Sequence, residues 1–394
     1  MNIFEKFFDA QRKHFDQGGR FEKLWPLFES IESVFFLPAR VTRTAPNVRD
    51  SLDVKRYMML VIVAVLPHYV FGVYNTGLQS HLASGLSTEL FPVIITGLKY
   101  VVPIVVVTYV VGIFWEILFA VVRRHEVSEG LFVSCALFPL TLPATIPLWQ
   151  VALGISFGIV IGKEIFGGTG RNFLNPALTG RAFLYFAYPA QISGDAVWTA
   201  LLGGRTTPVD GISGATPLAV AATTERSGDI QAALSDAGYS ALDLFLGTYP
   251  GSIGGTSTLL GVVGAAFLII LGIASYRIVF GCILGLLGTG FFLNIVATES
   301  AMPFLTLNPL YHLILGGAMF AFAYMATDPV SAAHMQGARW VFGFGIGVLT
   351  VLIRVFNPAY PAGVGLAVLF MNLFAPLLDQ IEIKLRLRKR ISNV

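Results

Sequence analysis

Long apolar runs separated by short polar segments dominate this chain from about residue 56 onward. Each run has about 20 residues or somewhat fewer, which is the length that an α-helix needs to cross the hydrocarbon core of a bilayer. We therefore predict ten membrane-spanning helices, at residues 56–74, 100–122, 130–143, 148–166, 175–189, 257–275, 278–297, 309–326, 339–356 and 360–379.

The composition supports an all-α polytopic membrane protein. Of 394 residues, 55% are hydrophobic and only 12% are charged, whereas a soluble domain carries about 25% charged residues. Basic residues gather in the N-terminal segment 1–54 and in the C-terminal tail 381–394. Since basic flanks stay in the cytoplasm, an even number of spans predicts two cytoplasmic termini and an outer location for the polar segment 190–256. The basic ends are thus read as a topology signal, and no nucleic-acid partner is expected.

Residues 1–54 interleave aromatic and charged side chains. This pattern predicts a cytoplasmic arm of short amphipathic helices that lies on the membrane surface or against a partner. Packing of the arm on the transmembrane body explains the same pattern equally well.

The apolar part of the chain repeats itself once. Residues 149–177 carry a tryptophan and spaced glycines and end in Phe-Leu-Asn-Pro-Ala, and residues 340–359 carry the same order and end in Val-Phe-Asn-Pro-Ala. Five spans in each half, 55–189 and 257–380, are an odd number, so the two halves must be inverted across the membrane. Inverted halves with spans interrupted by glycine and proline predict an ion path near the midplane. The alternative is that Asn-Pro merely begins a helix, because proline suits the first turn.

Three carboxylates interrupt the apolar runs or lie at their edges: Glu116, Asp328 and Asp379. A charge in the hydrocarbon layer costs a few kcal/mol or more and usually serves a function. Hard cations such as sodium prefer oxygen ligands. We therefore predict a sodium path along these acids, toward the cytoplasmic side, with a snorkelling side chain as the alternative for Asp379.

The polar segment 190–256 contains the stretch Asp-Gly-Ile-Ser-Gly-Ala-Thr at residues 210–216. Its small residues leave the backbone open, so that a bulky group can approach the hydroxyl of Thr216. That hydroxyl is a candidate attachment point for a phosphate-bearing cofactor. On these residues alone, a Gly/Ser turn that bonds its own backbone is the alternative.

A second polar patch follows the fourth span, where Arg171, Asn172 and Asn175 lie among glycines. Amide side chains can bond the edge of an isoalloxazine ring or ribityl hydroxyls. A dinucleotide-binding loop is not predicted, because the third glycine and a preceding strand are missing. NADH is therefore not expected to bind this chain directly.

These two stretches, 210–216 and Gly-Lys-Glu-Ile-Phe-Gly-Gly-Thr-Gly-Arg-Asn-Phe-Leu-Asn-Pro-Ala at 162–177, resemble the NqrB/RnfD family. Its members are membrane subunits of the sodium-translocating NADH:quinone reductase and of the related Rnf complexes. The residue order at 162–177 and the long N-terminal arm favour the quinone reductase branch of the family. The resemblance runs through nearly the whole chain.

The resemblance implies a translocase: a membrane subunit of a redox-driven sodium pump, in a complex of six subunits in the bacterial inner membrane. Electrons would arrive from NADH, oxidised on another subunit, and reach ubiquinone. The implied cofactors are FMN, esterified to Thr216, and a non-covalent riboflavin. An Rnf-type subunit of a ferredoxin:NAD oxidoreductase, and a flavin-free channel of the similar ammonium and urea transporter fold, are the alternatives.

Residue roles follow from the same resemblance. The FMN motif comprises Asp210, Ser213, Gly214, Ala215 and Thr216. Riboflavin is expected against Asn172 and Asn175 with Arg171 nearby, ubiquinone near Gly112 and Glu116, and sodium along Glu116, Asp328 and Asp379.

Overall fold

The computed structural model describes most of the chain beyond the N-terminal segment. The described residues are 10–15, 19–21, 25, 28, 54–123, 127–128, 130–195, 197–203, 208, 214–224, 229–297, 302–357, 360 and 362–391. The predicted N-terminal arm therefore lies mostly outside the described residues.

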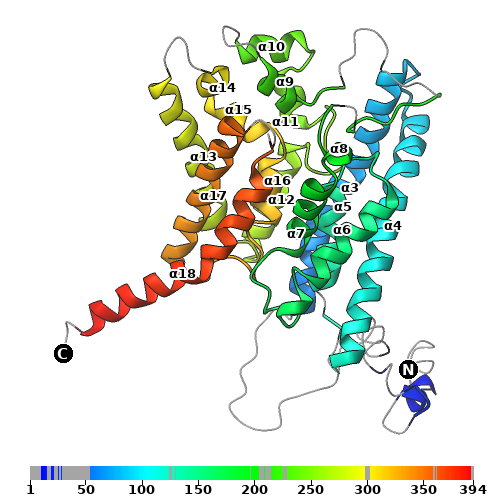
Figure 1. Ribbon diagram of the computed structural model, residues 1–394, viewed down its shortest axis with the longest axis vertical. Helices are drawn as coiled ribbons and strands as arrows, with labels where there is room; N and C mark the ends of the chain where they lie inside the picture. Colours follow the sequence, from blue (N-terminus) through cyan, green and yellow to red (C-terminus); the bar gives the residue numbers. More distant parts are fainter. Residues whose placement is uncertain are drawn as a thin grey trace.

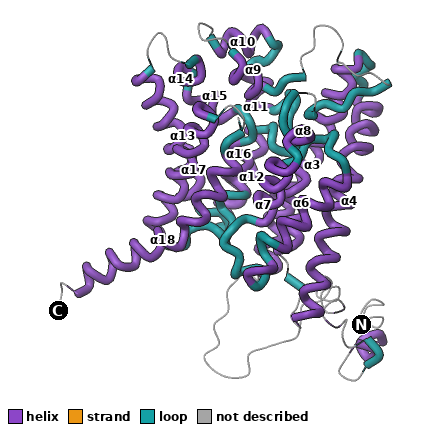
Figure 2. Tube along the Cα trace, in the orientation of Figure 1, coloured by secondary structure: helices purple, strands orange, loops and turns teal. Residues whose placement is uncertain are grey.

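Helices are the only regular elements in this part of the chain (Figures 1 and 2). Six helical segments are long and apolar enough to cross a membrane: Arg56–Ser84 in α3 (Val54–Ser84), α4 (Leu90–Arg123), Leu148–Phe166 across α6 (Leu148–Val160) and η2 (Glu164–Phe166), α13 (Tyr276–Val296), α17 (Gln336–Phe356) and Val364–Arg388 in α18 (Val364–Ile391). Two shorter apolar helices are α5 (Gly130–Leu140) and α12 (Thr258–Ile270). An all-helical polytopic membrane protein is thus confirmed.

The first two helices are longer than their apolar runs predict. Helix α3 continues to Ser84 and α4 begins at Leu90, because polar groups in this region find partners inside the protein. Asn75 donates to the carbonyl of Tyr249 at 3.0 Å. A Cβ atom at Gly77 would lie 1.9 Å from the carbonyl oxygen of Val93, so glycine permits the two helices to approach this closely.

The predicted span 309–326 is broken in its middle. It consists of α15 (Pro309–Ile314) and α16 (Ala318–Tyr324), separated by Gly316 and Gly317 with φ of +66° and +69°. Glycine adopts this left-handed backbone without steric cost. A Cβ atom at Gly317 would lie 2.7 Å from the carbonyl oxygen of Gly255. The break is therefore fixed by a contact with a distant loop as well as by local preference.

A second break follows α5, where prolines interrupt the third predicted span. The sequence predicts free carbonyls here that need water, an ion or a side chain. Those of Leu140 and Leu142 instead accept the main-chain N–H groups of Gly254 (2.9 Å) and Ile253 (3.1 Å). Main chain from residues 253–254 thus satisfies this break.

The helices form one bundle with two distinct ends. Helix α4 packs on α6 and α6 on α7 (Pro176–Ala187), while α13 packs on α17 and α17 on α18. Short helices complete the bundle: α8 (Pro189–Ile192), α9 (Pro217–Thr223), α10 (Ile230–Asp236), α11 (Ala241–Leu246) and α14 (Pro303–Thr306). Helices α9 and α10 lie at the top of Figure 1, and the C-terminal part of α18 extends from the opposite end. We call these the Thr216 end and the Lys163 end.

Candidate functional site

Thr216 begins helix α9. Its hydroxyl oxygen accepts the N–H of Ala219 at 3.2 Å, and Pro217 occupies the first helical position. The hydroxyl of Tyr239 donates to the carbonyl of Ala215 at 2.7 Å. Burial raises the pKa of Tyr239 to about 12, so this phenol stays protonated and remains a donor at neutral pH. Of the 210–216 motif, the structure describes Gly214–Thr216, and Asp210 and Ser213 lie outside the described residues.

A cavity that opens to the surface adjoins Thr216. Aromatic and polar side chains contribute to its wall: Arg181, Tyr185, Asp195, Trp198, Tyr249, Thr256 and Tyr360. The rings of Tyr185 and Tyr360 meet edge to face, with centroids 4.3 Å apart. The hydroxyl of Thr256 is buried and has no hydrogen-bond partner. Aromatic walls and an unsatisfied polar atom fit a planar ligand with polar edges.

At the Lys163 end, Asn175 connects the two halves of the chain. Its side-chain oxygen accepts the N–H of Leu178 at the start of α7, and its Nδ2 donates to Asp328 at 3.3 Å. Asp328 also accepts the hydroxyl of Ser331 at 2.9 Å and the N–H of Val330 at 3.0 Å. Asn175 and Asp328 are 153 positions apart, and they form one polar group between α7 and the segment after α16.

A second cavity lies beside this group. Its polar lining is Tyr57, Ser134, Lys163, Thr169, Asn172, Asn175, Thr327 and Asp328. The hydroxyl of Thr169 is buried without a hydrogen-bond partner, and Asn172 donates to the carbonyl of Leu174 at 2.9 Å. The structure thus brings Asn172, Asn175 and Asp328 together, although the sequence assigns them to different ligands.

Arg171 does not line the cavity that Asn172 and Asn175 line. Positive φ angles at Gly167, Gly168 and Gly170 turn the chain sharply before it. The Arg171 side chain is exposed and lines a separate cleft with Glu116 and Arg123.

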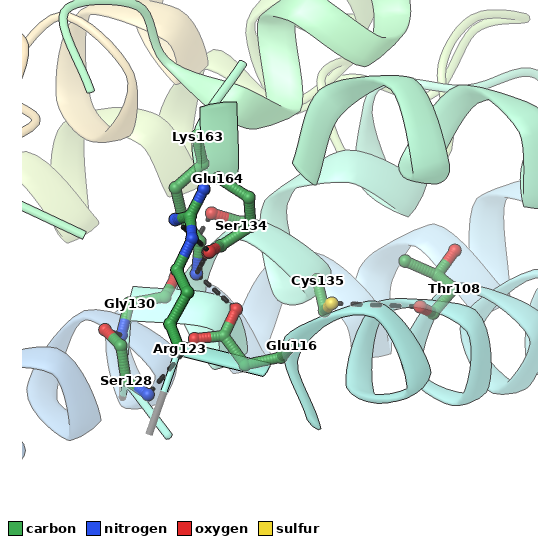
Figure 3. Close-up of polar contacts among 9 residues, drawn as sticks. All are labelled: Thr108, Glu116, Arg123, Ser128, Gly130, Ser134, Cys135, Lys163 and Glu164. Carbon is green, nitrogen blue, oxygen red and sulfur yellow. Dashed lines mark hydrogen bonds and ion pairs between the residues drawn. The ribbon is translucent and has the colours of Figure 1, made fainter. Parts of the chain in front are cut away.

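Glu116 belongs to a buried cluster of charges between α4 and η2 (Figure 3). Its Oε2 lies 2.5 Å from Nζ of Lys163, and its Oε1 accepts the N–H of Ser128 at 3.1 Å. The same ammonium group lies 3.3 Å from Oε1 of Glu164, whose Oε2 lies 3.4 Å from Arg123. Side chains of Lys163 and Glu116 are only 2% and 1% exposed. The sequence analysis assigns no role to Lys163, although this basic residue lies within the predicted span 148–166, directly after Gly162.

Gly112 lies one turn before Glu116 and faces the interior. A Cβ atom there would lie 2.5 Å from the sulfur of Cys135 and 3.2 Å from Ile159. Phe114, on a different face of α4, is 58% exposed. Glycine at position 112 therefore lets α4 pack closely on α5 and α6.

Asp379 bonds main chain at the beginning of α17. Its oxygens accept the N–H groups of His334 and Met335, the shorter bond being 2.7 Å from Met335. Glu382, on the next turn of α18, accepts the N–H of Ala338 at 2.6 Å. Two carboxylates of α18 thus satisfy the free donors of the α17 N-terminus.

Arg354 is a buried charge that sequence reasoning missed, although it interrupts the apolar run 339–356. Its guanidinium group donates to the carbonyls of Leu315 (2.8 Å), Ala362 (3.2 Å) and His312. These carbonyls lie at the break between α15 and α16 and just before α18.

Comparison with known proteins identifies the family. A model of the family described as NQR2, RnfD, RnfE matches residues 41–387. A subunit of the Na(+)-translocating NADH-quinone reductase of Chromohalobacter salexigens is 48% identical, over 98% of this chain and 95% of that protein. The corresponding subunits of Ectopseudomonas mendocina and Azotobacter vinelandii are 47% and 46% identical, over 98% and 99% of both chains. The chain therefore belongs to the NQR2, RnfD, RnfE family.

Proposed function

We propose that this chain is the NqrB-type membrane subunit of a sodium-translocating NADH:quinone reductase in a bacterial inner membrane. The proposal rests on the near full-length similarity to subunits of enzymes of that name. The aromatic cavity beside Thr216 supports a flavin-bearing subunit over a flavin-free channel. The names of these relatives favour the quinone reductase over an Rnf-type complex.

The proposed architecture is ten spans in two inverted five-helix repeats. The domains are the cytoplasmic arm 1–54, the repeats 55–189 and 257–380, the outer loop 190–256 and the basic tail 381–394. The matching contacts α4–α6–α7 and α13–α17–α18 support this division. In this topology both termini are cytoplasmic and the Thr216 end is periplasmic.

Thr216 would hold FMN through its hydroxyl oxygen, as the family motif implies. Tyr185, Trp198 and Tyr360 line the adjoining cavity, where an isoalloxazine ring would pack against aromatic walls. Arg181 would supply a positive charge and hydrogen-bond donors. Bound flavin would supply the redox chemistry. The side chains of this chain would hold and orient its ring.

Riboflavin would occupy the second cavity, against Asn172 and Asn175. The unpartnered hydroxyl of Thr169 in the same wall supports a polar ligand there. Arg171 is expected at this site from the family; its side chain lines the neighbouring cleft, so we assign it to the entrance.

Sodium would pass Glu116 and Asp328, whose carboxylates lie near the Lys163 end. Asp379 stays a candidate from the resemblance, with both oxygens already bonded to main chain. Ubiquinone is proposed near Gly112 and Glu116. The other subunits of the complex are the remaining partners, and NADH would bind one of them.

The test is flavin fluorescence of the denatured chain in a gel under ultraviolet light. Thr216→Ala should abolish the fluorescence while the complex still assembles. Thr223→Ala is the matched control, because it removes another hydroxyl from α9 and should leave the band fluorescent. A fluorescent Thr216→Ala band would overturn the attachment site.

Replacing both Asn172 and Asn175 by Leu should remove extractable riboflavin from the purified complex, with the covalent flavin on Thr216 retained. Unchanged riboflavin content would move that cofactor elsewhere.

A further inference from the structure

Lys163 holds the carboxylate through which sodium is proposed to enter. Its ammonium group contacts Glu116 and Glu164 at 2.5 and 3.3 Å, as Figure 3 illustrates. Among these residues Arg123 is the one near the surface, with a side chain 34% exposed. The contact between Lys163 and Glu116 is thus the enclosed part of the cluster.

The cluster is electrically balanced. Glu116 and Glu164 contribute two negative charges, and Lys163 and Arg123 contribute two positive charges. A sodium ion that joined them would leave an uncompensated positive charge in a buried site, which is strongly unfavourable. Sodium can therefore bind Glu116 only if a positive charge leaves.

The contacts of Glu116 show which cation must leave the cluster and which carboxylate oxygen it then exposes. Oε1 of Glu116 is held by the N–H of Ser128, whereas Oε2 is held by Lys163. Arg123 directs its guanidinium group to the other carboxylate of the cluster, that of Glu164. Exchange at Oε2 thus requires movement of Lys163.

Lys163 has a second acidic site within the cavity that it lines. That cavity is also lined by Asp328 and Asn175, while Glu116 lines a neighbouring open cleft. A lysine ammonium group on a flexible four-carbon chain can turn from one site to another. Lys163 therefore contacts one carboxylate proposed for the sodium path and borders the cavity that the other one lines.

We propose that Lys163 is a tethered counter-cation that competes with sodium for Oε2 of Glu116 and turns toward Asp328 when sodium binds. This inference rests on the proposed sodium role of Glu116. It makes Lys163 a positioning residue that sets the sodium affinity of the entry site and helps to displace the bound ion.

The test is a sodium titration of quinone reduction by the full complex. Lys163→Met should lower the sodium concentration for half-maximal activity by about fivefold or more, the lower range of coupling between two sites. The maximal rate should also fall, because no cation displaces the bound sodium. Arg123→Met is the matched comparison: it removes an equal charge from the more exposed edge of the cluster but leaves Lys163 on Oε2 of Glu116, so it should lower the half-maximal concentration less than Lys163→Met does. An equal decrease in both variants would show that the net charge of the cluster, and not Lys163 on Oε2, sets the sodium affinity. Lys163→Gln repeats the test with a polar side chain if the methionine variant assembles poorly.

Glu116→Gln distinguishes failure of the sodium site from failure of the lysine's role, because it should raise the half-maximal sodium concentration. Suppose that the half-maximal sodium concentration rises in Glu116→Gln but does not fall in Lys163→Met or Lys163→Gln. The sodium role of Glu116 would then stand, and the role of Lys163 alone would be overturned. An unchanged value in Glu116→Gln would overturn the sodium role of Glu116 and the inference together. The double variant Glu116→Gln/Lys163→Met should match Glu116→Gln, and an additional decrease would contradict competition at Glu116.

Discussion

Two buried cations, Lys163 and Arg354, lie toward opposite ends of the bundle and are stabilised in different ways. Lys163 pairs with carboxylate side chains and borders a cavity. Arg354, whose side chain is 1% exposed, donates to three main-chain carbonyls and pairs with no carboxylate in the part of the chain that the structure describes.

The partners decide what each cation can do. Main-chain carbonyls at a helix break cannot move away without unfolding the break, so Arg354 is a fixed part of the fold. A carboxylate can exchange one cation for another, because its charge is satisfied by either. Burial alone therefore does not mark an ion path, whereas the chemistry of the partners does.

The largest effect is expected from Arg354→Met, which removes the donors from the carbonyls of His312, Leu315 and Ala362. Each buried acceptor left unsatisfied costs about 1–3 kcal/mol. We expect loss of most assembled complex, measured as yield and as the temperature of inactivation. Arg339→Met is the control, since the Arg339 side chain donates to the carbonyl of Ala333 at 3.3 Å and is partly exposed. Equal yields for both variants would contradict a structural role for Arg354.

The second prediction concerns the stability of the Lys163–Glu116 pair. Removing one partner of a buried ion pair costs about 3–5 kcal/mol, because the other charge is left unpaired. Lys163→Met and Glu116→Gln should each lower the inactivation temperature, and the double variant should recover part of the loss. A double variant whose losses simply add would show that the two side chains do not stabilise one another.

The third prediction concerns the wall beside that pair. Gly112→Ala should push α4 from α5, because the new Cβ would lie 2.5 Å from the sulfur of Cys135; overpacking costs about 1–3 kcal/mol. Adding Cys135→Ala should restore stability and quinone reduction. If the defect in quinone affinity persists in the double variant at normal stability, Gly112 contacts the quinone itself.

The smallest effect is expected from Asp379→Ala, which removes the acceptor for the N–H groups of His334 and Met335. Loss of such a cap costs about 1 kcal/mol. Thermal inactivation should shift slightly, and the sodium titration should keep the wild-type midpoint. A raised sodium requirement at normal flavin content would instead support the place of Asp379 in the ion path that the family resemblance implies.

Periodicity and length predict much of this fold, because apolar side chains must face lipid or core. The helices and the three acids at their edges follow from that rule. The extra length of α3 and α4 does not, since it depends on partners such as Tyr249, 174 positions from Asn75. The break at Gly316 and Gly317 likewise depends on Gly255.

Which residues pair with one another at the Lys163 end is harder to predict from the sequence than the helices that carry them. Asn175 and Asp328 lie 153 positions apart, and Glu116 and Lys163 lie 47 apart on different elements. No local pattern specifies such pairs. Arg171 and Asn172 show the converse: they are adjacent in sequence, yet Asn172 lines the second cavity and Arg171 the neighbouring cleft.

The exchange of sodium for Lys163 on Glu116 can be observed most directly by infrared difference spectroscopy of the full complex. Spectra with and without sodium should differ in the carboxylate stretching bands. One sodium-dependent carboxylate band should disappear in Glu116→Gln, which assigns it to Glu116. The same band should persist in Arg123→Met. It should change in Lys163→Met, because sodium there binds a carboxylate that has no ammonium partner. A sodium-dependent carboxylate band that is identical in the wild type, Glu116→Gln and Lys163→Met would contradict the exchange.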